Sequence, residues 1–207
     1  MDDVEKIATE NDPVVIGVVA DTHIPDRVGE LHPRLLEELT RQQVQLILHA
    51  GDISVMRVIS ELETVAPVRA VTGNSDFLLS KEIPNKRCLE VYGSQIVLIH
   101  GHLDPRTYWM DKFQYITQGY KFDRYLRRFV RAFLEARVIV FGHTHHPENQ
   151  WIDGKLYFNP GSVSHGDLLD RTPNYGLLKF YKDGRIDAEI IPLKGAVICA
   201  KRLVEQR

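Results

Sequence analysis

Aspartate, asparagine and histidine residues recur directly after the apolar segments of this 207-residue chain, usually beside a glycine. These stretches are Asp21-Thr22-His23, Gly51-Asp52, Gly73-Asn74-Ser75-Asp76, His100-Gly101-His102 and Gly142-His143-Thr144-His145. Carboxylate oxygens combined with imidazole nitrogens suit Mn²⁺, iron or Zn²⁺, whereas Ca²⁺ prefers oxygen ligands alone. Nine such groups are too many for one four-coordinate ion, whereas about seven ligands suit two ions that share a carboxylate. The pattern therefore predicts a pair of divalent metal ions.

Each of these motifs, taken singly, also has a structural explanation. A lone histidine at a strand end is usually a hydrogen-bonded structural residue, and we interpret His49 in this way. Gly51-Asp52 can be a turn whose aspartate caps the helix that follows. The metal interpretation depends on all five stretches meeting at one place. The glycines favour such a meeting, because they let the backbone turn sharply and approach its neighbours closely.

Apolar segments predict the strands that would carry these residues. Residues 14–20, 45–50 and 68–71 are rich in β-branched and other apolar side chains and are predicted to be buried strands. Helical spacing of leucine, isoleucine and valine predicts helices between them, over about 32–43 and across 55–62. The order β-α-β-α-β favours a parallel sheet with right-handed crossovers. Ligand sites form at the carboxyl edge of such sheets, which is where the polar stretches fall.

The second half of the chain favours hairpins. Gly93-Ser94, Asp153-Gly154 and Asp183-Gly184 each separate two short apolar segments, as tight turns do. The long stretch 106–137 has a mostly helical pattern. Together these features predict an α/β fold, a four-layer α-β-β-α sandwich of two mixed β-sheets flanked by helices.

Composition bounds the remaining possibilities. We expect a flexible, acidic N-terminal segment over 1–13 and a single domain over 14–207, whose tail from residue 197 could form a short helix. A formal net charge of -2 argues against a protein that coats nucleic acid, although it allows a local basic groove. We find no signal peptide and no apolar run of membrane-spanning length. Cys88 and Cys199 form no paired motif, so a cytoplasmic location is expected.

The ordered set D-x-H, G-D, G-N-x-D, H-G-H and G-H-T-H resembles the calcineurin-like metallophosphoesterase superfamily, from about Val14 to Pro192. The stretch Asn159-Pro160-Gly161-Ser162 resembles its small bacterial and archaeal phosphodiesterase branch, and a scaffold subunit of the retromer shares that compact form. The resemblance implies that the first metal is held by Asp21, His23, Asp52 and His145, and that Asp52 bridges to a second metal completed by Asn74, His100 and His143. Mn²⁺ is the expected ion, with iron, Ni²⁺ or Zn²⁺ as alternatives.

The resemblance also implies a reaction, namely hydrolysis of a phosphodiester by a hydroxide bound between the two cations, with Asp52 and Asn74 in the catalytic centre. Many relatives have histidine after the Gly-Asn pair, where this chain has Ser75, a poor general acid. His102 is the other candidate for the proton donor; alternatively it binds a phosphate oxygen or only packs beside the metals. Ser75, Asp76 and His102 are expected to contact substrate.

Other functions stay open at this point. A phosphomonoesterase or a nuclease could have the same fold, and so could a non-catalytic scaffold that binds proteins. The complete ligand set disfavours a scaffold, Ser75 favours diesters over monoesters, and the net charge of -2 disfavours a dedicated nuclease. The expected substrate is thus a small phosphodiester or nucleotide, with nucleic acid less favoured. We expect no membrane partner, and a homo-oligomer is an open alternative.

Residues 106–131 mix aromatic and basic side chains. The cations Lys121, Arg124, Arg127, Arg128 and Arg131 recur at spacings of three and four, which can place them on one helix face. Such a segment could close over the site as a lid that offers stacking and charge to a nucleotide or single strand. We favour the alternative, an ordinary amphipathic helix with solvated cations and an aromatic core face.

Overall fold

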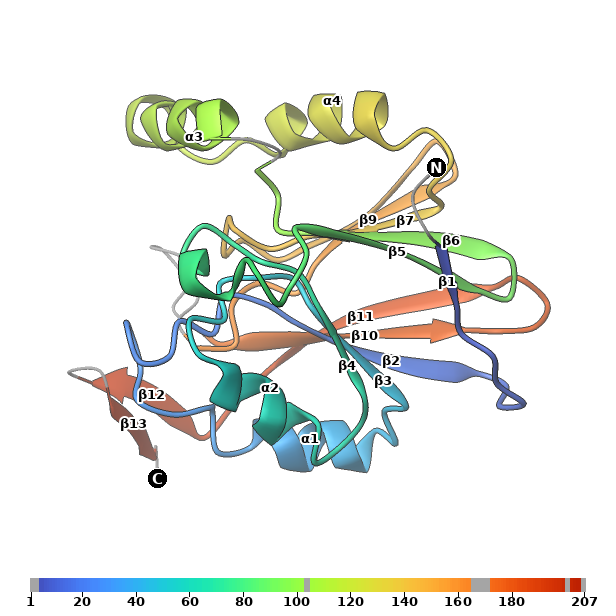
Figure 1. The fold of residues 1–207 in the computed structure, drawn as a ribbon, viewed down its shortest axis with the longest axis horizontal. Helices are drawn as coiled ribbons and strands as arrows, with labels where there is room; N and C mark the ends of the chain where they lie inside the picture. The colour runs from blue at the N-terminus through green and yellow to red at the C-terminus, as the bar shows by residue number, and fades with distance from the viewer. Residues whose placement is uncertain (1–3, 103–104, 165–171, 200–201, 206–207) are drawn as a thin grey trace.

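Two β-sheets pack face to face between helices in the computed structural model, which describes residues 4–102, 105–164, 172–199 and 202–205 (Figure 1). Helices α1 and α2 cover the outer face of one sheet, and α3 and α4 cover the outer face of the other. The predicted four-layer sandwich is therefore confirmed. Within the described part of the chain, the helices are too short or too polar to cross a membrane.

The first sheet, called sheet B here, contains the predicted parallel unit. Among the described residues its order is β11-β10-β2-β3-β4. Its strands are β2 (Val14–Val19), β3 (Leu46–His49), β4 (Val68–Ala70), β10 (Asn174–Phe180) and β11 (Ile186–Pro192). Strands β2, β3 and β4 run parallel and are connected by α1 (Leu35–Arg41) and α2 (Met56–Leu62), which confirms the β-α-β-α-β order.

The second sheet, sheet A, is built mainly from the predicted hairpins. Its order within the described ranges is β1-β5-β6-β7-β9-β8. Its strands are β1 (Val4–Lys6), β5 (Lys86–Val91), β6 (Ser94–Ile99), β7 (Val138–Val140), β8 (Glu148–Ile152) and β9 (Lys155–Asn159). The pairs β5–β6, β8–β9 and, in sheet B, β10–β11 are antiparallel, as the turn signals predicted.

Alternation along the strands divides the apolar side chains between two faces. In β2, Val14, Ile16 and Val18 join the layer between the sheets, while Val15 and Val19 pack toward α1 and α2. Because successive side chains of a strand point to opposite faces, a strand buried on both sides must be apolar throughout. The continuous apolar runs in the sequence reflect this double burial.

The outer layer on sheet A consists of α3 (Pro105–Gln118) and α4 (Phe122–Ala132). Tyr125 and Phe129 of α4 are buried against Phe141 and Tyr157 at the outer face of the sheet. In this respect α4 is the amphipathic helix that we favoured. Helix α3 differs, because several of its large apolar side chains face solvent: Trp109, Met110, Phe113 and Ile116.

Both ends of the chain differ from the sequence expectation. Residues 4–6, expected within a flexible segment, form β1 and pair with β5 in parallel; Glu5 also pairs with Arg69, with 2.5 Å between Oε1 and Nη2. The tail, expected as a short helix, forms instead the antiparallel hairpin of β12 (Ala196–Cys199) and β13 (Arg202–Glu205). The tail is rich in β-branched valine and isoleucine, which favour strands over a short helix.

The layer between the sheets should dominate stability. Leu98 is 0% exposed in that layer, whereas Leu134 is 72% exposed. We expect Leu98→Ala to lower the free energy of unfolding by about 2–5 kcal/mol, because it removes buried methyl groups and leaves a cavity. Leu134→Ala, with the same change in composition, should shift it by less than about 0.5 kcal/mol. Urea unfolding of both variants checks this, and equal losses would contradict the assignment of the core.

Candidate metal centre

The predicted ligands meet at one edge, where strands of both sheets end. Asp21 and His23 follow β2, Asp52 follows β3, and Asn74 follows β4 in sheet B. His100 follows β6, and His143 and His145 follow β7 in sheet A. Three overlapping groups have their ligand atoms within 4.8 Å of one another: Asp21, His23 and His145; Asp21, Asp52 and His100; His100, His102 and His143. Asn74 joins them through its amide oxygen, as described below.

The backbone at these ligands is held in an uncommon conformation. The φ angles are 54° at Asp21, 48° at His23, 56° at Asp52, 71° at His143 and 60° at His145. Left-handed backbone at a residue other than glycine costs about 1–3 kcal/mol and persists only where surrounding contacts enforce it. Such contacts are present, since the amide of Asp21 donates to the Gly51 carbonyl at 3.0 Å and that of His23 to the Asp52 carbonyl at 2.9 Å. Strain of this kind gathers at functional sites.

Two glycines allow the carboxylates to approach the neighbouring loops. A Cβ atom on Gly73 would lie 2.3 Å from Asp52 Oδ1. A Cβ atom on Gly142 would lie 2.9 Å from the Ala50 carbonyl and 3.0 Å from Asp21 Oδ2. Both contacts are too close for any side chain, so the glycines predicted to permit convergence are required for it.

One half of the site gathers two imidazoles and two carboxylates. The Nε2 atoms of His23 and His145 are 3.3 Å apart. His145 Nε2 is 3.6 Å from Asp21 Oδ1, and His23 Nε2 is 3.3 Å from Asp52 Oδ2. Two ring nitrogens that face each other beside carboxylate oxygens form a donor set that fits a divalent cation with nitrogen and oxygen ligands.

The other half is centred on Asn74. Its Oδ1 atom is 3.2 Å from His100 Nε2 and 3.0 Å from His143 Nδ1. His100 Nε2 is also 3.5 Å from Asp52 Oδ2. The same carboxylate oxygen of Asp52 therefore lies between the two halves, where a ligand shared by two cations would have to lie.

Burial and mutual charge decide the protonation of these groups. Burial lowers the pKa of His23 to about 3 and that of His143 well below its ordinary value, so both imidazoles are neutral and able to bind metal. Burial raises the pKa of Asp21 to about 6, against the opposing influence of His145. Burial alone would lower the pKa of His100, but the Asp52 carboxylate raises it to about 9. Conversely, burial would raise the pKa of Asp52, but His100 and His23 bring it below the ordinary value.

It follows that without metal the buried Asp52 carboxylate is balanced by a proton on His100. A cation that binds at His100 Nε2 would displace this proton and take over its role as the positive partner of the Asp52 carboxylate. The donor set thus fits divalent ions in charge as well as in geometry.

Asp76 has a different position from the one expected. Its carboxylate is buried, and Oδ1 accepts hydrogen bonds from the amides of Ile53 at 2.8 Å and Ser54 at 2.7 Å. Its Oδ2 accepts from the amide of Gly73 at 2.8 Å. Both oxygens are committed to the backbone, so Asp76 positions the loops that carry Asp52 and Asn74. The expected contact of Asp76 with substrate stays a prediction.

Further polar side chains hold the loops from behind. Ser162 Oγ and Ser164 Oγ donate to the Asp21 carbonyl at 2.8 and 3.0 Å. Asn159 Nδ2 donates to the Gly142 carbonyl at 3.0 Å. His49 is buried with Nε2 3.3 Å from Thr22 Oγ1, in agreement with the structural role that we assigned to it. Such outer contacts orient metal ligands.

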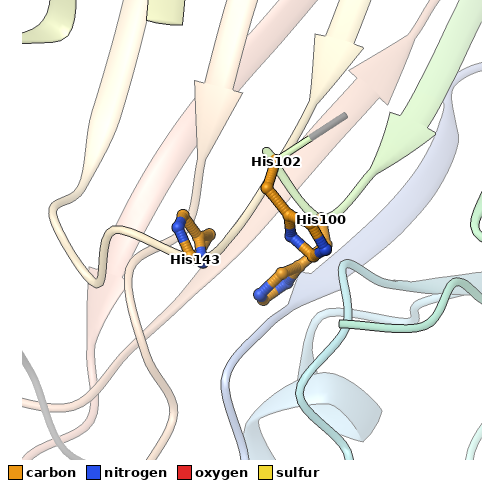
Figure 2. A group of neighbouring side chains, drawn as sticks. All are labelled: His100, His102 and His143. Carbon is orange, nitrogen blue, oxygen red and sulfur yellow. The ribbon is translucent and has the colours of Figure 1, made fainter. Parts of the chain in front are cut away.

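His102 is partly buried and lies beside His100 and His143, in the half of the site that is centred on Asn74. Figure 2 shows His100, His102 and His143 with their rings converging from the ends of two neighbouring strands. The His102 ring centroid is 5.4 Å from that of His100 and 5.5 Å from that of His143. Burial lowers the pKa of His102 to about 4, so its imidazole is neutral. Among the described residues, no hydrogen-bond partner meets His102 Nδ1. Ser75 contacts the site in two ways: its amide donates to Asp52 Oδ1 at 2.8 Å, and its Oγ accepts from Asn74 Nδ2 at 3.4 Å.

Tyr108 is a neighbour of the site that the motifs did not reveal. Its ring centroid is 5.9 Å from that of His102 and 5.8 Å from that of His143. The aromatic and basic composition of 106–131 pointed to the segment but not to this residue. A helix period alone could not show which of its aromatics faces the metal edge.

Comparisons with known proteins agree with this geometry. Residues 14–183 match the family described as calcineurin-like phosphoesterase superfamily domain. A probable metallophosphoesterase of Methanothermobacter thermautotrophicus is 36% identical over 187 residues, which cover 90% of this chain and 96% of that protein. Vacuolar protein sorting 29 of Cryptosporidium parvum is similar in fold with a TM-score of 0.62 at 20% identity, covering 88% of this chain and 99% of that one. A novel archaeal phosphodiesterase gives a TM-score of 0.58 at 22% identity, covering 86% and 99%.

Metal binding should stabilise the fold. For metal-stripped protein at a Mn²⁺ concentration of about 100 Kd, mass action adds about 2.7 kcal/mol per site, which corresponds to a rise in Tm of about 5–10 °C. Asp52→Asn should reduce this rise by more than half, because it weakens both halves of the site. Differential scanning fluorimetry and elemental analysis of bound metal measure the two effects.

The matched control is Asp26→Asn, which removes the same charge from an exposed aspartate whose Oδ2 accepts from Ser54 Oγ at 2.9 Å. It should leave the rise in Tm unchanged. An Asp52→Asn variant with the full rise and full metal content would refute the shared-ligand assignment.

Proposed function

This chain belongs to the calcineurin-like phosphoesterase superfamily, as its motifs predicted, and on that premise we propose that it is a two-metal phosphodiesterase. The observation that carries the proposal is the position of Asp52 Oδ2, which is 3.3 Å from His23 Nε2 in one half of the site and 3.5 Å from His100 Nε2 in the other. Mixed nitrogen and oxygen donors favour Mn²⁺, with iron, Ni²⁺ or Zn²⁺ as alternatives.

The chain supplies the ligands and their positioning. Asp21, His23, Asp52 and His145 would hold one ion, and Asp52, Asn74, His100 and His143 the other. When bound, such a pair polarises phosphoryl oxygens and lowers the pKa of water, so that no separate general base is needed. The ligand side chains are held in place by strained backbone and by hydrogen bonds with the neighbouring loops. Their fixed positions would fix the ions and thereby the orientation of the ester.

His102 would act on the substrate from the mouth of the site. A neutral imidazole between the metal ligands and Tyr108 can hydrogen-bond a phosphoryl oxygen or the oxygen of the leaving group. Ser75 has a hydroxyl in place of the imidazole that many relatives have, which supports substrates whose leaving group needs little protonation. Diesters with a stable leaving alkoxide fit this arrangement better than monoesters.

Competing functions have less support. A non-catalytic scaffold has no need for a complete ligand set with buried, charge-balanced carboxylates. The fold of vacuolar protein sorting 29 is similar, but at 20% sequence identity the similarity supports a common fold and gives no support to a common function. The archaeal protein described as a phosphodiesterase supports diester chemistry only in the same limited way. A cytoplasmic small phosphodiester or nucleotide is the substrate that we propose.

The proposed activity can be tested directly. We expect metal-stripped protein to cleave a chromogenic phosphodiester only after Mn²⁺ is added, and to cleave the matching phosphomonoester at least tenfold more slowly. Steady-state rates across Mn²⁺, Fe²⁺, Ni²⁺ and Zn²⁺ provide the measurement. Faster monoester cleavage would identify a phosphomonoesterase instead. If two metals bind without turnover of either ester, the scaffold function gains support.

His102→Ala should separate chemistry from metal binding. We expect kcat for the diester to fall by about 10²–10³-fold, the range for a lost hydrogen bond to an oxygen that gains charge in the transition state, with metal content intact. A suitable control is Lys182→Ala, because Lys182 is exposed in the turn between β10 and β11, at the opposite end of sheet B from the metal edge. Loss of one metal in the His102 variant would show that His102 is a ligand, as its cluster with His100 and His143 also permits.

A further inference from the structure

Helices α3 and α4 lie side by side over the outer face of sheet A (Figure 1). Side chains of both helices line a basic groove. Its cavity volume is about 480 Å³. The residues that matter here are Met110 and Gln114 on α3 and Arg124, Arg127, Arg128 and Arg131 on α4. The groove is thus lined by the four arginines of the predicted basic helix face, and Lys121 of that set is not part of the lining.

One of these arginines has a structural role. Arg128 forms two hydrogen bonds with the buried Asp111, from Nη1 to Oδ2 at 2.8 Å and from Nη2 to Oδ1 at 2.7 Å. Its Nη1 also donates to the carbonyl of Gly101 at 3.2 Å, between His100 and His102. Arg128 therefore joins α4 to α3 and to the loop of the metal centre, and its charge is balanced.

The other arginines keep their charge unbalanced. Arg127 Nε donates to the carbonyl of Asp123 at 3.2 Å, and Arg124 donates to Gln118 Oε1 at 3.0 Å. Within the described ranges, no carboxylate pairs with Arg124, Arg127 or Arg131. Three other exposed arginines do have such partners, in the pairs Arg41–Glu38, Arg57–Glu61 and Arg185–Asp187.

Uncompensated like charges at helical spacings of three and four repel one another. An anion in the groove would relieve this repulsion. Guanidinium groups bind phosphate with paired hydrogen bonds, so a phosphate-bearing ligand suits them best.

Aromatic side chains beside the groove narrow the class of ligand. Trp109 and Phe113 of α3 are 65% and 68% exposed. They are four residues apart and so share one helix face, next to the face of Met110 and Gln114. Exposed aromatics beside a phosphate-binding groove are the arrangement that single-stranded nucleic acids use, with bases stacked on rings and phosphates on cations.

The groove is also close to the metal centre. Tyr108 faces His102 on one side of α3, while Met110 lines the groove on another. Since a helix with its side chains is about 10–12 Å wide, a strand of a few nucleotides could cover both.

We propose that this groove binds single-stranded nucleic acid, with phosphates on Arg127 and Arg131 and a base on Trp109. Binding in the groove is independent of hydrolysis. That the strand is then delivered to the metal centre as substrate rests on the proposed phosphodiesterase function. The net charge of -2 is compatible with this site, because the positive charge is local.

The test measures binding of the metal-loaded full chain to a fluorescein-labelled phosphorothioate 12-mer of thymidine by fluorescence anisotropy, at 50–200 mM salt. Arg127→Gln/Arg131→Gln should weaken binding at least tenfold and reduce the slope of log K against log salt by about 1.4, from two phosphate contacts at about 0.7 each. The control Arg41→Gln/Arg57→Gln removes the same charge from α1 and α2 on the opposite side of the molecule and should keep wild-type affinity (Figure 1).

Trp109→Ala distinguishes a strand from a simple anion. It should weaken binding of the 12-mer about fivefold or more and leave competition by inorganic tripolyphosphate unchanged. Three results would overturn the proposal. The groove and control variants could lose equal affinity for the 12-mer, Trp109→Ala could have no effect on that affinity, or the protein could bind phosphatidylserine vesicles and not the 12-mer. A wild-type protein that cleaves the chromogenic diester without binding the 12-mer refutes the groove alone, and one that binds without cleaving any diester refutes only the proposed activity.

Discussion

Removal of the Asp52 carboxylate from water is the constraint on which the rest of the site depends. A buried negative charge is stable only beside cations or hydrogen-bond donors. Asp52 finds them in His23 from sheet B, in His100 from sheet A and in the amide of Ser75. Because the partners come from both sheets, the charge can be balanced only if strands of both sheets end at the same edge. The four-layer sandwich provides that edge.

The loops at this edge are shaped by the same requirement. A strand that continued past its last residue would alternate its side chains between faces and could not aim several at one point. The left-handed backbone at Asp21, Asp52 and His143 turns each side chain toward the centre, at a cost of about 1–3 kcal/mol each. Ser162, Asn159 and Asp76 offset that cost with hydrogen bonds to the loop backbone. The ligands are thus rigid before any ion binds.

How far the sequence predicts this structure depends on whether a feature is local. Strands buried on both faces must be apolar throughout, so β2, β3 and the hairpins could be read from composition and turn residues. The polar residues that gather at the metal edge could be predicted as well, because metal chemistry limits the residue types, and their binding of metal stays a prediction. The positions of Asp76 and Tyr108 could not be predicted. The role of a carboxylate is open until its hydrogen bonds are known, and helical periodicity does not show which face of α3 meets the sheet. The strand β1 depends on a long-range pair, Glu5 with Arg69, that no local pattern reveals.

Specificity is then expected to reside in the layer formed by α3 and α4 and not at the metal edge. The edge is constrained twice, since Asp52 and His100 balance each other's charge and both belong to the candidate ligand groups. The outer layer has only to cover sheet A, which Tyr125 and Phe129 of α4 already do. Its remaining side chains are not needed for that packing, yet they are not distributed as solvation alone would require. Among the described residues, Arg124, Arg127 and Arg131 line the groove without a carboxylate partner, while the rings of Trp109 and Phe113 face solvent beside it. The bidentate pair of Arg128 with Asp111 fixes both helices to the loop of His100 and His102, so whatever the groove holds is positioned relative to the metal ligands.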